Sequence, residues 1–281
     1  MIGVIDVGGG MRGIYAAGIF DRCLEEGITF DLGIGVSAGS ANLSSFIARQ
    51  HGRNYKFYTE YTMTKDYLSL RNFLKTRSFM DLEYVYETLS NSDGVYPLDY
   101  DAFAANPMDF IIVAEEAETG NARYFRKDEI AKDKYDAQKA SSAIPFICKP
   151  YVIDGVPYYD GALADPVPVE KAFAEGCDKV VLILTLPEDT VRNSSNDEKF
   201  AKRIRKKYPV SAEKLIGRAA KYNEEVEIAR EYARQGKLLI VAPDDTCGVS
   251  TLTREEEALK ALYAKGREDG LKIKEFLEKE D

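Results

Sequence analysis

The sequence predicts an α/β fold, a three-layer sandwich with a mostly parallel sheet and a mostly helical C-terminal extension. Short apolar runs alternate along the chain with segments of helical periodicity. The apolar runs are continuous rather than alternating with polar residues, which is typical of parallel strands buried on both faces. The 281 residues are 45% hydrophobic and 30% charged, so wholesale disorder is excluded and a large core is expected.

Two strand–turn–helix units open the chain. Residues 2–7 form an apolar run that enters three consecutive glycines, and residues 14–26 then show helical spacing. A second apolar run at Leu32–Val36 is followed by a predicted helix over residues 38–50. Both units therefore predict buried strands that end in glycine-rich turns at the same edge of the sheet.

Three later runs complete the predicted sheet, at Asp109–Ala114, Val180–Leu186 and Leu238–Ala242. The stretches Glu115–Phe125 and Tyr151–Tyr159 each contain a glycine turn between β-forming residues. We expect these two stretches to add antiparallel hairpins at one edge of the sheet.

Charge divides the chain into two regions. Asp and Glu number 47 against 38 Lys and Arg, and the net charge of −9 argues against a nucleic-acid partner. Residues 191–281, which begin with a polar segment, carry 20 basic and 18 acidic residues, so residues 1–190 carry 18 and 29. We expect a core over residues 1–190 and an extension over residues 191–281 that returns a strand to the same domain.

The four cysteines include no Cys-x-x-Cys pair, which predicts neither a disulfide framework nor a zinc site. The N-terminus shows no leader pattern, and no run of about 18 apolar residues could span a bilayer. The sequence predicts a soluble, cytoplasmic protein.

The first glycine-rich turn, residues 8–13, reads Gly-Gly-Gly-Met-Arg-Gly and matches the dinucleotide fingerprint. That interpretation requires an acidic residue at the carboxyl end of the second strand, where this chain has Ser37. Asp31 lies at the opposite end of that strand, so the dinucleotide interpretation is disfavoured. The turn would still present backbone N–H groups at a helix N-terminus, a site for negative charge, unless it is only a structural turn.

The second turn, Gly35-Val36-Ser37-Ala38-Gly39, lies between a strand and a helix and matches the nucleophile elbow of serine hydrolases. Because both turns end neighbouring strands, one could supply a nucleophile and the other the donors of an oxyanion hole.

A serine nucleophile needs a base, and His51 is the single histidine. His51 follows Ser37 by 14 residues on the predicted helix, about 21 Å at the helical rise, so a Ser-His-Asp triad is excluded. The base must then be a carboxylate, a lysine or a tyrosine. Asp160, in Asp160-Gly161-Ala162, follows a predicted hairpin and has aromatic and apolar neighbours that would raise its pKa. The alternative is that Asp-Gly marks a plain turn.

These three motifs, in this order and with the block Ser141-Ser142-Ala143-Ile144-Pro145, resemble the patatin-like phospholipase family. The resemblance covers about residues 2–186 and implies an α/β sandwich that hydrolyses acyl esters of lipids without a metal or cofactor. It also implies roles for individual residues: Ser37 as nucleophile, Asp160 as proton acceptor, Gly8, Gly9 and Gly10 as oxyanion donors with Arg12 adjoining, and Gly13, Gly35, Gly39, Gly161 and Ala162 as support. The chain departs from the family at Val7, where an acidic residue or glycine is frequent. Asp6, one position earlier, has no assigned role.

The expected activity is that of a phospholipase A or lysophospholipase. The alternatives are a small-ester or thioester hydrolase, and a catalytically silent protein that binds lipids or acyl groups. The aromatic stretch Tyr55–Met63 could form a lid or acyl-chain wall, although a buried helix face is favoured. The basic run Lys202–Lys207 could touch anionic headgroups, or it could be a solvated helix face. The net charge of −9 leaves only transient contact with a membrane surface.

Overall fold

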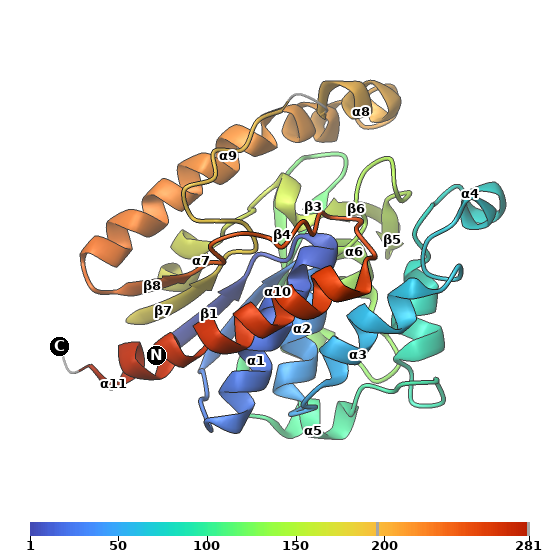
Figure 1. Ribbon diagram of the computed structural model, residues 1–281. Helices are drawn as coiled ribbons and strands as arrows, with labels where there is room; N and C mark the ends of the chain where they lie inside the picture. Colours follow the sequence, from blue (N-terminus) through green and yellow to red (C-terminus); the bar gives the residue numbers. More distant parts are fainter. Residues whose placement is uncertain (195–196, 280–281) are drawn as a thin grey trace.

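The computed structural model describes residues 1–194 and 197–279, and in them eight strands form one sheet (Figure 1). The order across the sheet is β5-β6-β3-β2-β1-β7-β8, with β4 paired to β3. The strands are β1 (Ile2–Asp6), β2 (Leu32–Val36), β3 (Asp109–Glu116), β4 (Ala122–Arg126), β5 (Tyr151–Ile153), β6 (Val156–Asp160), β7 (Lys179–Ile183) and β8 (Leu238–Val241). Strands β3, β2, β1, β7 and β8 are parallel, whereas β4, β5 and β6 pair antiparallel. The predicted mostly parallel sheet with hairpins at one edge is confirmed.

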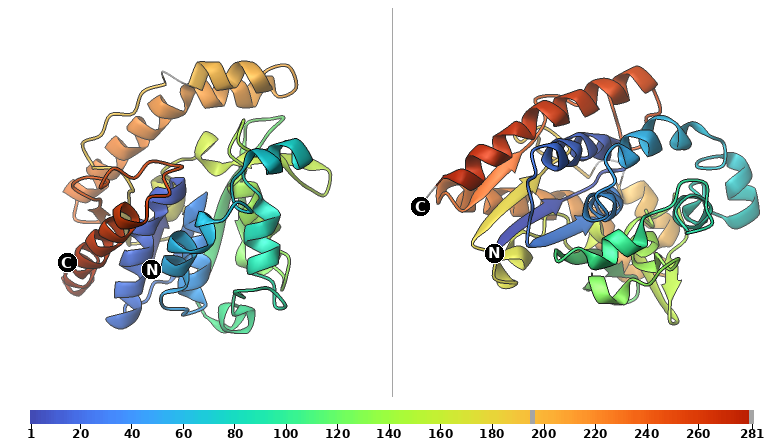
Figure 2. Two further views of the ribbon diagram at one scale, coloured as in Figure 1. Left: turned by 45° about the vertical axis from the view of Figure 1, so that its right-hand side comes forward. Right: turned by 90° about the horizontal axis from the view of Figure 1, so that it is seen from below.

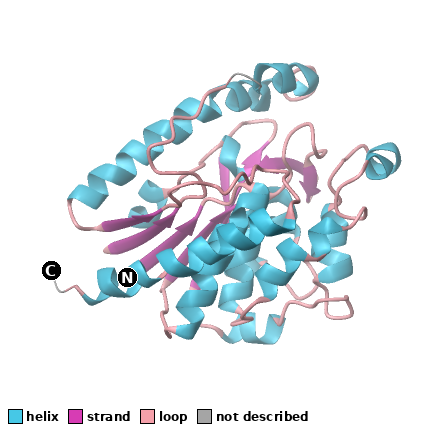
Figure 3. Cartoon of the chain, in the orientation of Figure 1, coloured by secondary structure: helices cyan, strands magenta, loops and turns pink. Residues whose placement is uncertain are grey.

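Helices cover both faces of the sheet, as Figure 3 shows by colour. They are α1 (Ile14–Glu25), α2 (Ala38–Ile47), α3 (Arg53–Thr59), α4 (Leu70–Thr76), α5 (Tyr100–Ala105), α6 (Asp136–Ser141), α7 (Val169–Ala174), α8 (Asp197–Ile204), α9 (Pro209–Arg234), α10 (Glu256–Asp269) and α11 (Leu271–Glu278). Short turns of helix are η1 (Gly10–Gly13), η2 (Tyr61–Met63), η3 (Tyr84–Leu89), η4 (Lys127–Glu129) and η5 (Gly161–Leu163). Helices α1, α2 and α10 pack on one face, and α7 and α9 pack on the other.

The two faces of β1 illustrate how the layers are separated. Val4 belongs to the hydrophobic cluster beneath α1 and α2, while the next residue, Ile5, belongs to the cluster beneath α7 and α9. Both side chains are fully buried, which explains why the strand sequence is apolar without alternation.

The C-terminal region contributes to both helical layers and to the sheet. Strand β8 extends the sheet beside β7, helix α9 packs on one face, and helix α10 lies along α1 on the other, as the views in Figure 2 also show. A third hydrophobic cluster joins α8 and the start of α9 to the end of β6 and to η5. The C-terminal region therefore reaches the carboxyl edge of the sheet, where the glycine-rich turns lie.

Some element boundaries differ from those predicted. Helix α2 ends at Ile47 rather than near Gln50, because Arg49 adopts a left-handed conformation with φ 55° that stops the helix. Strand β7 ends at Ile183 rather than at Leu186, and just beyond it the Thr185 hydroxyl donates a hydrogen bond to the Gly8 carbonyl. Within residues 1–194 and 197–279, no helix combines the length and the apolar character needed to cross a membrane.

Candidate active site

The two glycine-rich turns lie side by side at the carboxyl edge of the sheet. Strands β1 and β2 are parallel neighbours, with Asp6 opposite Gly35, so the turns that follow them meet. A Cβ atom added to Gly39 would lie 2.2 Å from the Asp6 carbonyl oxygen, and one added to Gly8 would lie 2.3 Å from the Val36 carbonyl oxygen. Backbones this close leave no room for a larger residue, which gives the glycines of both motifs a structural reason.

Ser37 occupies the sharp turn between β2 and α2. Its backbone has φ 55° and ψ −128°, a strained conformation that is typical of a nucleophile elbow. Two hydrogen bonds hold the turn: the Ser37 N–H donates to the Ser141 hydroxyl at 2.8 Å, and the Ser40 hydroxyl donates to the Ser37 carbonyl at 2.7 Å. The side chain is only 6% exposed and lines a cavity.

Asp160 lies at the end of β6, with its side chain toward Ser37. The Ala162 N–H donates a hydrogen bond to its carboxylate at 2.9 Å. Burial raises the pKa of Asp160 above its ordinary value, while the neighbouring Ser37 hydroxyl and the Ala162 N–H oppose that rise. A Cβ atom at Gly161 would lie 2.2 Å from the Val113 carbonyl oxygen, so the glycine lets β6 and η5 approach β3 closely.

Asp6 is a site residue to which the sequence analysis gave no role. Its fully buried carboxylate accepts hydrogen bonds from the Gly8 N–H and from the Asn42 amide, each at 2.9 Å. Burial raises the pKa of Asp6 to about 6, against the effect of both hydrogen bonds. Asp6 therefore fixes the glycine turn against α2. The sequence signal for this role was an acidic residue at the end of an apolar strand, before a glycine turn.

The role of Asp6 narrows the predicted set of oxyanion donors. Because the Gly8 N–H donates to Asp6, it is already used, whereas the N–H groups of Gly9 and Gly10 make no hydrogen bond to another described residue. The adjacent Met11 N–H donates to the Thr251 carbonyl. Of the predicted Gly8–Gly10 donors, Gly9 and Gly10 remain available.

The remaining predicted residues lie around these groups. Gly13 ends η1, and a Cβ atom there would lie 2.4 Å from the Tyr58 hydroxyl oxygen. Arg12 is 8% exposed and lines the same cavity as Ser37.

Two cavities meet at Ser37. The first has a volume of about 300 Å³ and is lined by the glycine turn, Asp160 and three arginines. The second, about 40 Å³, is walled by apolar and aromatic side chains that include Tyr58, Tyr67 and Tyr86. Tyr58, from the predicted aromatic stretch, is thus both a core residue and part of this apolar wall.

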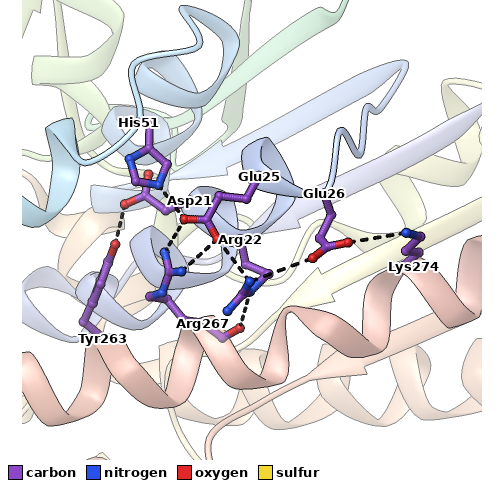
Figure 4. A network of polar contacts seen from close by, with 8 residues as sticks. All are labelled: Asp21, Arg22, Glu25, Glu26, His51, Tyr263, Arg267 and Lys274. Carbon is purple, nitrogen blue, oxygen red and sulfur yellow. Dashed lines mark hydrogen bonds and ion pairs between the residues drawn. The ribbon is translucent and has the colours of Figure 1, made fainter.

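His51 lies outside both cavities. Its Nε2 atom is 2.9 Å from Oε1 of Glu25, which also receives two hydrogen bonds from the Arg267 guanidinium (Figure 4). The same network includes a hydrogen bond from the Tyr263 hydroxyl to Asp21. His51 therefore belongs to a polar contact that ties α1 to α10.

The described residues contain no group of three or more His, Cys, Asp or Glu side chains arranged to hold a metal ion. The groups at the cavity wall that could do chemistry include a serine hydroxyl, a buried carboxylate and two glycine backbone N–H groups. Such a set can form and break an acyl-oxygen bond at Ser37.

Comparison with known proteins gives four findings. A family model described as patatin-like phospholipase matches residues 7–173, and one described as a domain of unknown function (DUF6363) matches residues 208–279. The uncharacterized protein YjjU of Escherichia coli (strain K12) is 31% identical over 191 residues, or 66% of this chain and 52% of that protein. This chain therefore spans about half the length of that relative. A crystal structure of VipD from Legionella pneumophila matches 97% of this chain and 66% of its own, with a TM-score of 0.49 and 13% identity.

Proposed function

Because the chain belongs to the patatin-like phospholipase family of lipid acyl hydrolases, we propose that it hydrolyses carboxylic esters with a Ser37–Asp160 dyad. The observation that carries the proposal is the position of the buried Asp160 carboxylate beside the Ser37 hydroxyl on the wall of one cavity. A carboxylate with a raised pKa is a better proton acceptor than an ordinary aspartate, and Asp160 lies next to the hydroxyl whose proton must move.

In the first half of the reaction, Ser37 Oγ forms a bond to the ester carbonyl carbon while its proton passes to Asp160. The carbonyl oxygen becomes an oxyanion, which the N–H groups of Gly9 and Gly10 would stabilise by about 3 kcal/mol per donor. The tetrahedral intermediate then loses the alcohol, which takes the proton from Asp160, and an acyl-Ser37 ester remains.

In the second half, water gives a proton to Asp160 and its oxygen bonds to the acyl carbon. Breakage of the bond to Ser37 Oγ releases the carboxylic acid, and the proton on Asp160 returns to Ser37. The reaction needs no residue beyond these two and the oxyanion donors, which suits a chain whose single histidine lies elsewhere.

The apolar cavity beside Ser37 supports an acyl chain as the acid part of the substrate. A methylene chain placed among Tyr58, Tyr67 and Met80 would be removed from water, and each buried CH₂ would contribute about 0.8 kcal/mol to the free energy of binding. This supports an ester with an apolar acid part, and we propose a lipid ester of the phospholipase A or lysophospholipase type, with a small ester or thioester as the alternative. We also propose that residues 1–190 carry the dyad and that residues 191–281 complete the same domain, as the pairing of β8 with β7 supports.

Covalent labelling tests the dyad. A fluorophosphonate should label the wild type at Ser37, and Ser37→Ala should abolish both the labelling and ester hydrolysis. Asp160→Asn should lower kcat/KM by about 10³-fold or more while the far-UV circular dichroism stays unchanged.

The matched control is Ser92→Ala, which removes an exposed hydroxyl bonded to Asp133 outside both cavities. Ser92→Ala should be labelled by the fluorophosphonate and should hydrolyse the ester like the wild type. Labelling that persists in Ser37→Ala, or full turnover by Asp160→Asn, would reject the dyad; binding of lipid by a wild type without turnover would favour the silent binding protein.

A further inference from the structure

Three arginines line the catalytic cavity together with Ser37 and Asp160: Arg12, Arg192 and Arg218. Arg12 comes from the glycine motif. Arg192 and Arg218 follow the part of the chain that matches the patatin-like family, and Arg218 lies within the match to the domain of unknown function. The C-terminal region therefore supplies two of the three positive charges in the cavity.

Arg12 is buried without a carboxylate partner among residues 1–194 and 197–279. Its Nη1 donates to the Thr251 hydroxyl at 3.1 Å, and its buried Nε has no hydrogen-bond partner. Arginine is rarely this deeply buried unless it is paired, because an unpaired polar group loses its hydration without replacement. The unused donor capacity of Arg12 marks a place where a ligand could complete the site.

Arg192 is held against α9, and Arg218 lies on α9 with its guanidinium bonded to the first residue of α8. The Arg192 guanidinium lies 4.5 Å from the centre of the Tyr222 ring, and its backbone exchanges two hydrogen bonds with Asn223. In the described part of the chain Arg192 forms no ion pair, whereas Arg218 makes two hydrogen bonds to Asp197, at 2.7 and 2.9 Å. These contacts fix the positions of both guanidinium groups without neutralising Arg192.

Positive charge exceeds negative charge in the cavity, although the whole chain carries −9. Among the described residues that line it, Asp160 is the sole carboxylate, and Asp160 already accepts a hydrogen bond from the Ala162 N–H. Burial, and then the charge of Arg192, lowers the pKa of Arg12 to about 10, which is the expected effect of a nearby like charge. Such a group of guanidiniums is stabilised when an anion enters.

We propose that Arg12, Arg192 and Arg218 form a subsite for a phosphate group carried by the ester substrate. This rests on the proposed function, since the phosphate and the scissile ester would occupy one cavity beside Ser37. Guanidinium groups match phosphate oxygens through paired hydrogen bonds. The C-terminal region would thereby determine substrate choice.

The lining of the cavity also indicates which phosphate ester fits. A zwitterionic headgroup would bring a cationic amine, and the described wall offers only Asp160, which the reaction requires, as a carboxylate to receive it. A phosphate monoester, or a phosphodiester with an uncharged headgroup, presents negative charge alone. We therefore expect acyl glycerol phosphates to be preferred over acyl glycerophosphocholines and over neutral acyl glycerols.

Three short-chain substrates that stay monomeric in solution test this preference: hexanoyl glycerol 3-phosphate, hexanoyl glycerophosphocholine and hexanoyl glycerol. The wild type should show the highest kcat/KM for the phosphate monoester, by about tenfold or more over the neutral ester. In Arg192→Gln the ratio of kcat/KM for the phosphate monoester to kcat/KM for the neutral ester should fall about tenfold, mainly through a higher KM for the phosphate monoester. Arg192→Lys should restore part of this ratio. Arg234→Gln, which removes an exposed arginine from the end of α9, should leave the ratio unchanged.

Binding of inorganic phosphate, measured by calorimetry on the full chain, gives a readout that needs no turnover. Phosphate should bind the wild type and Arg234→Gln, bind Arg192→Gln about tenfold more weakly, and compete with the phosphate substrate. If no ester is hydrolysed but phosphate binds through Arg192, the proposed function fails while the anion site stands. If phosphate binds but esters with and without phosphate are cleaved equally, the site takes free phosphate and the substrate subsite is rejected. The substrate subsite is also rejected if the ratio of kcat/KM for the phosphate monoester to kcat/KM for the neutral ester is the same in the wild type and in Arg192→Gln.

Discussion

The turn at Ser37 and the wall at Arg192 and Arg218 face the same cavity, but they are built differently. The turn is fixed by backbone contacts between two neighbouring parallel strands, with Gly39 against Asp6. The wall is fixed by side chains, such as Asp197 on Arg218 and the Tyr222 ring under Arg192. The backbone-built part is intolerant of substitution, whereas the side-chain-built part can change its charge while the fold is kept.

This difference separates chemistry from selectivity. In the function that we propose, the strained turn and the neighbouring Asp160 position Ser37 as a nucleophile for any ester carbonyl. In the subsite that we propose, the arginines of the wall act on a part of the substrate that does not react, so they would affect which ester is bound. Three substitutions probe the contrast, and the first is expected to have the largest effect.

Gly39→Ala should destabilise the backbone-built turn strongly. The added Cβ would lie 2.2 Å from the carbonyl oxygen of Asp6, a fully buried residue that has little freedom to move. We expect a loss of about 3 kcal/mol in the free energy of unfolding, together with loss of ester hydrolysis. Urea unfolding followed by circular dichroism measures the first and a chromogenic ester the second. A stable and active Gly39→Ala protein would show that the two turns are not in backbone contact.

Glu225→Gln should make the free energy of unfolding less dependent on pH. Glu225 joins α9 to the chain that follows Asp160. The Val167 N–H donates to Glu225 at 2.7 Å, and Lys221 pairs with its other oxygen at 3.0 Å. Burial and the neighbouring Asp165 nevertheless raise the pKa of Glu225 to about 8. Because the folded state keeps a proton that the unfolded state releases near pH 4.5, this group makes the protein less stable as pH rises toward 8.

Thermal unfolding between pH 5 and pH 8 measures this effect. Titration of one proton changes the free energy of unfolding by at most about 1.4 kcal/mol per pH unit. The wild type should therefore lose stability across this range more steeply than Glu225→Gln. Equal slopes for the two proteins would mean that Glu225 is ionised in the fold.

Gly217→Ala should have the smallest effect, and in the opposite direction to Gly39→Ala. Gly217 lies exposed in the middle of α9, and a Cβ atom there would meet no atom within 4 Å. Alanine restricts the unfolded chain and favours helix, so we expect a gain of about 1 kcal/mol with unchanged hydrolysis. Destabilisation by this substitution, seen in the same urea experiment, would mean that this part of α9 is packed more closely than the structure shows.

Prediction from the sequence succeeded where the signal was local. The continuous apolar runs of β1 and β2 and the two glycine turns predicted strands that end at one edge, because each pattern lies within a few consecutive residues. Helix α2 was predicted three residues too long because the left-handed conformation of Arg49 has no marker in its side chain. Asp6 had a visible signal, an acidic residue ending an apolar strand, but its partner Asn42 is 36 residues away.

By itself the sequence determined the α/β class, the two glycine turns and the motifs that contain Ser37 and Asp160, since propensity and spacing are short-range properties. Only the tertiary structure decided that the Gly8 N–H is used by Asp6 and that Arg192 and Arg218 join Arg12 in one cavity. More than 170 residues separate Arg12 from the other two along the chain. No local sequence pattern predicts that residues so far apart along the chain lie in one cavity. Their proximity follows from the packing of α9 and the segment before it against the carboxyl edge of the sheet.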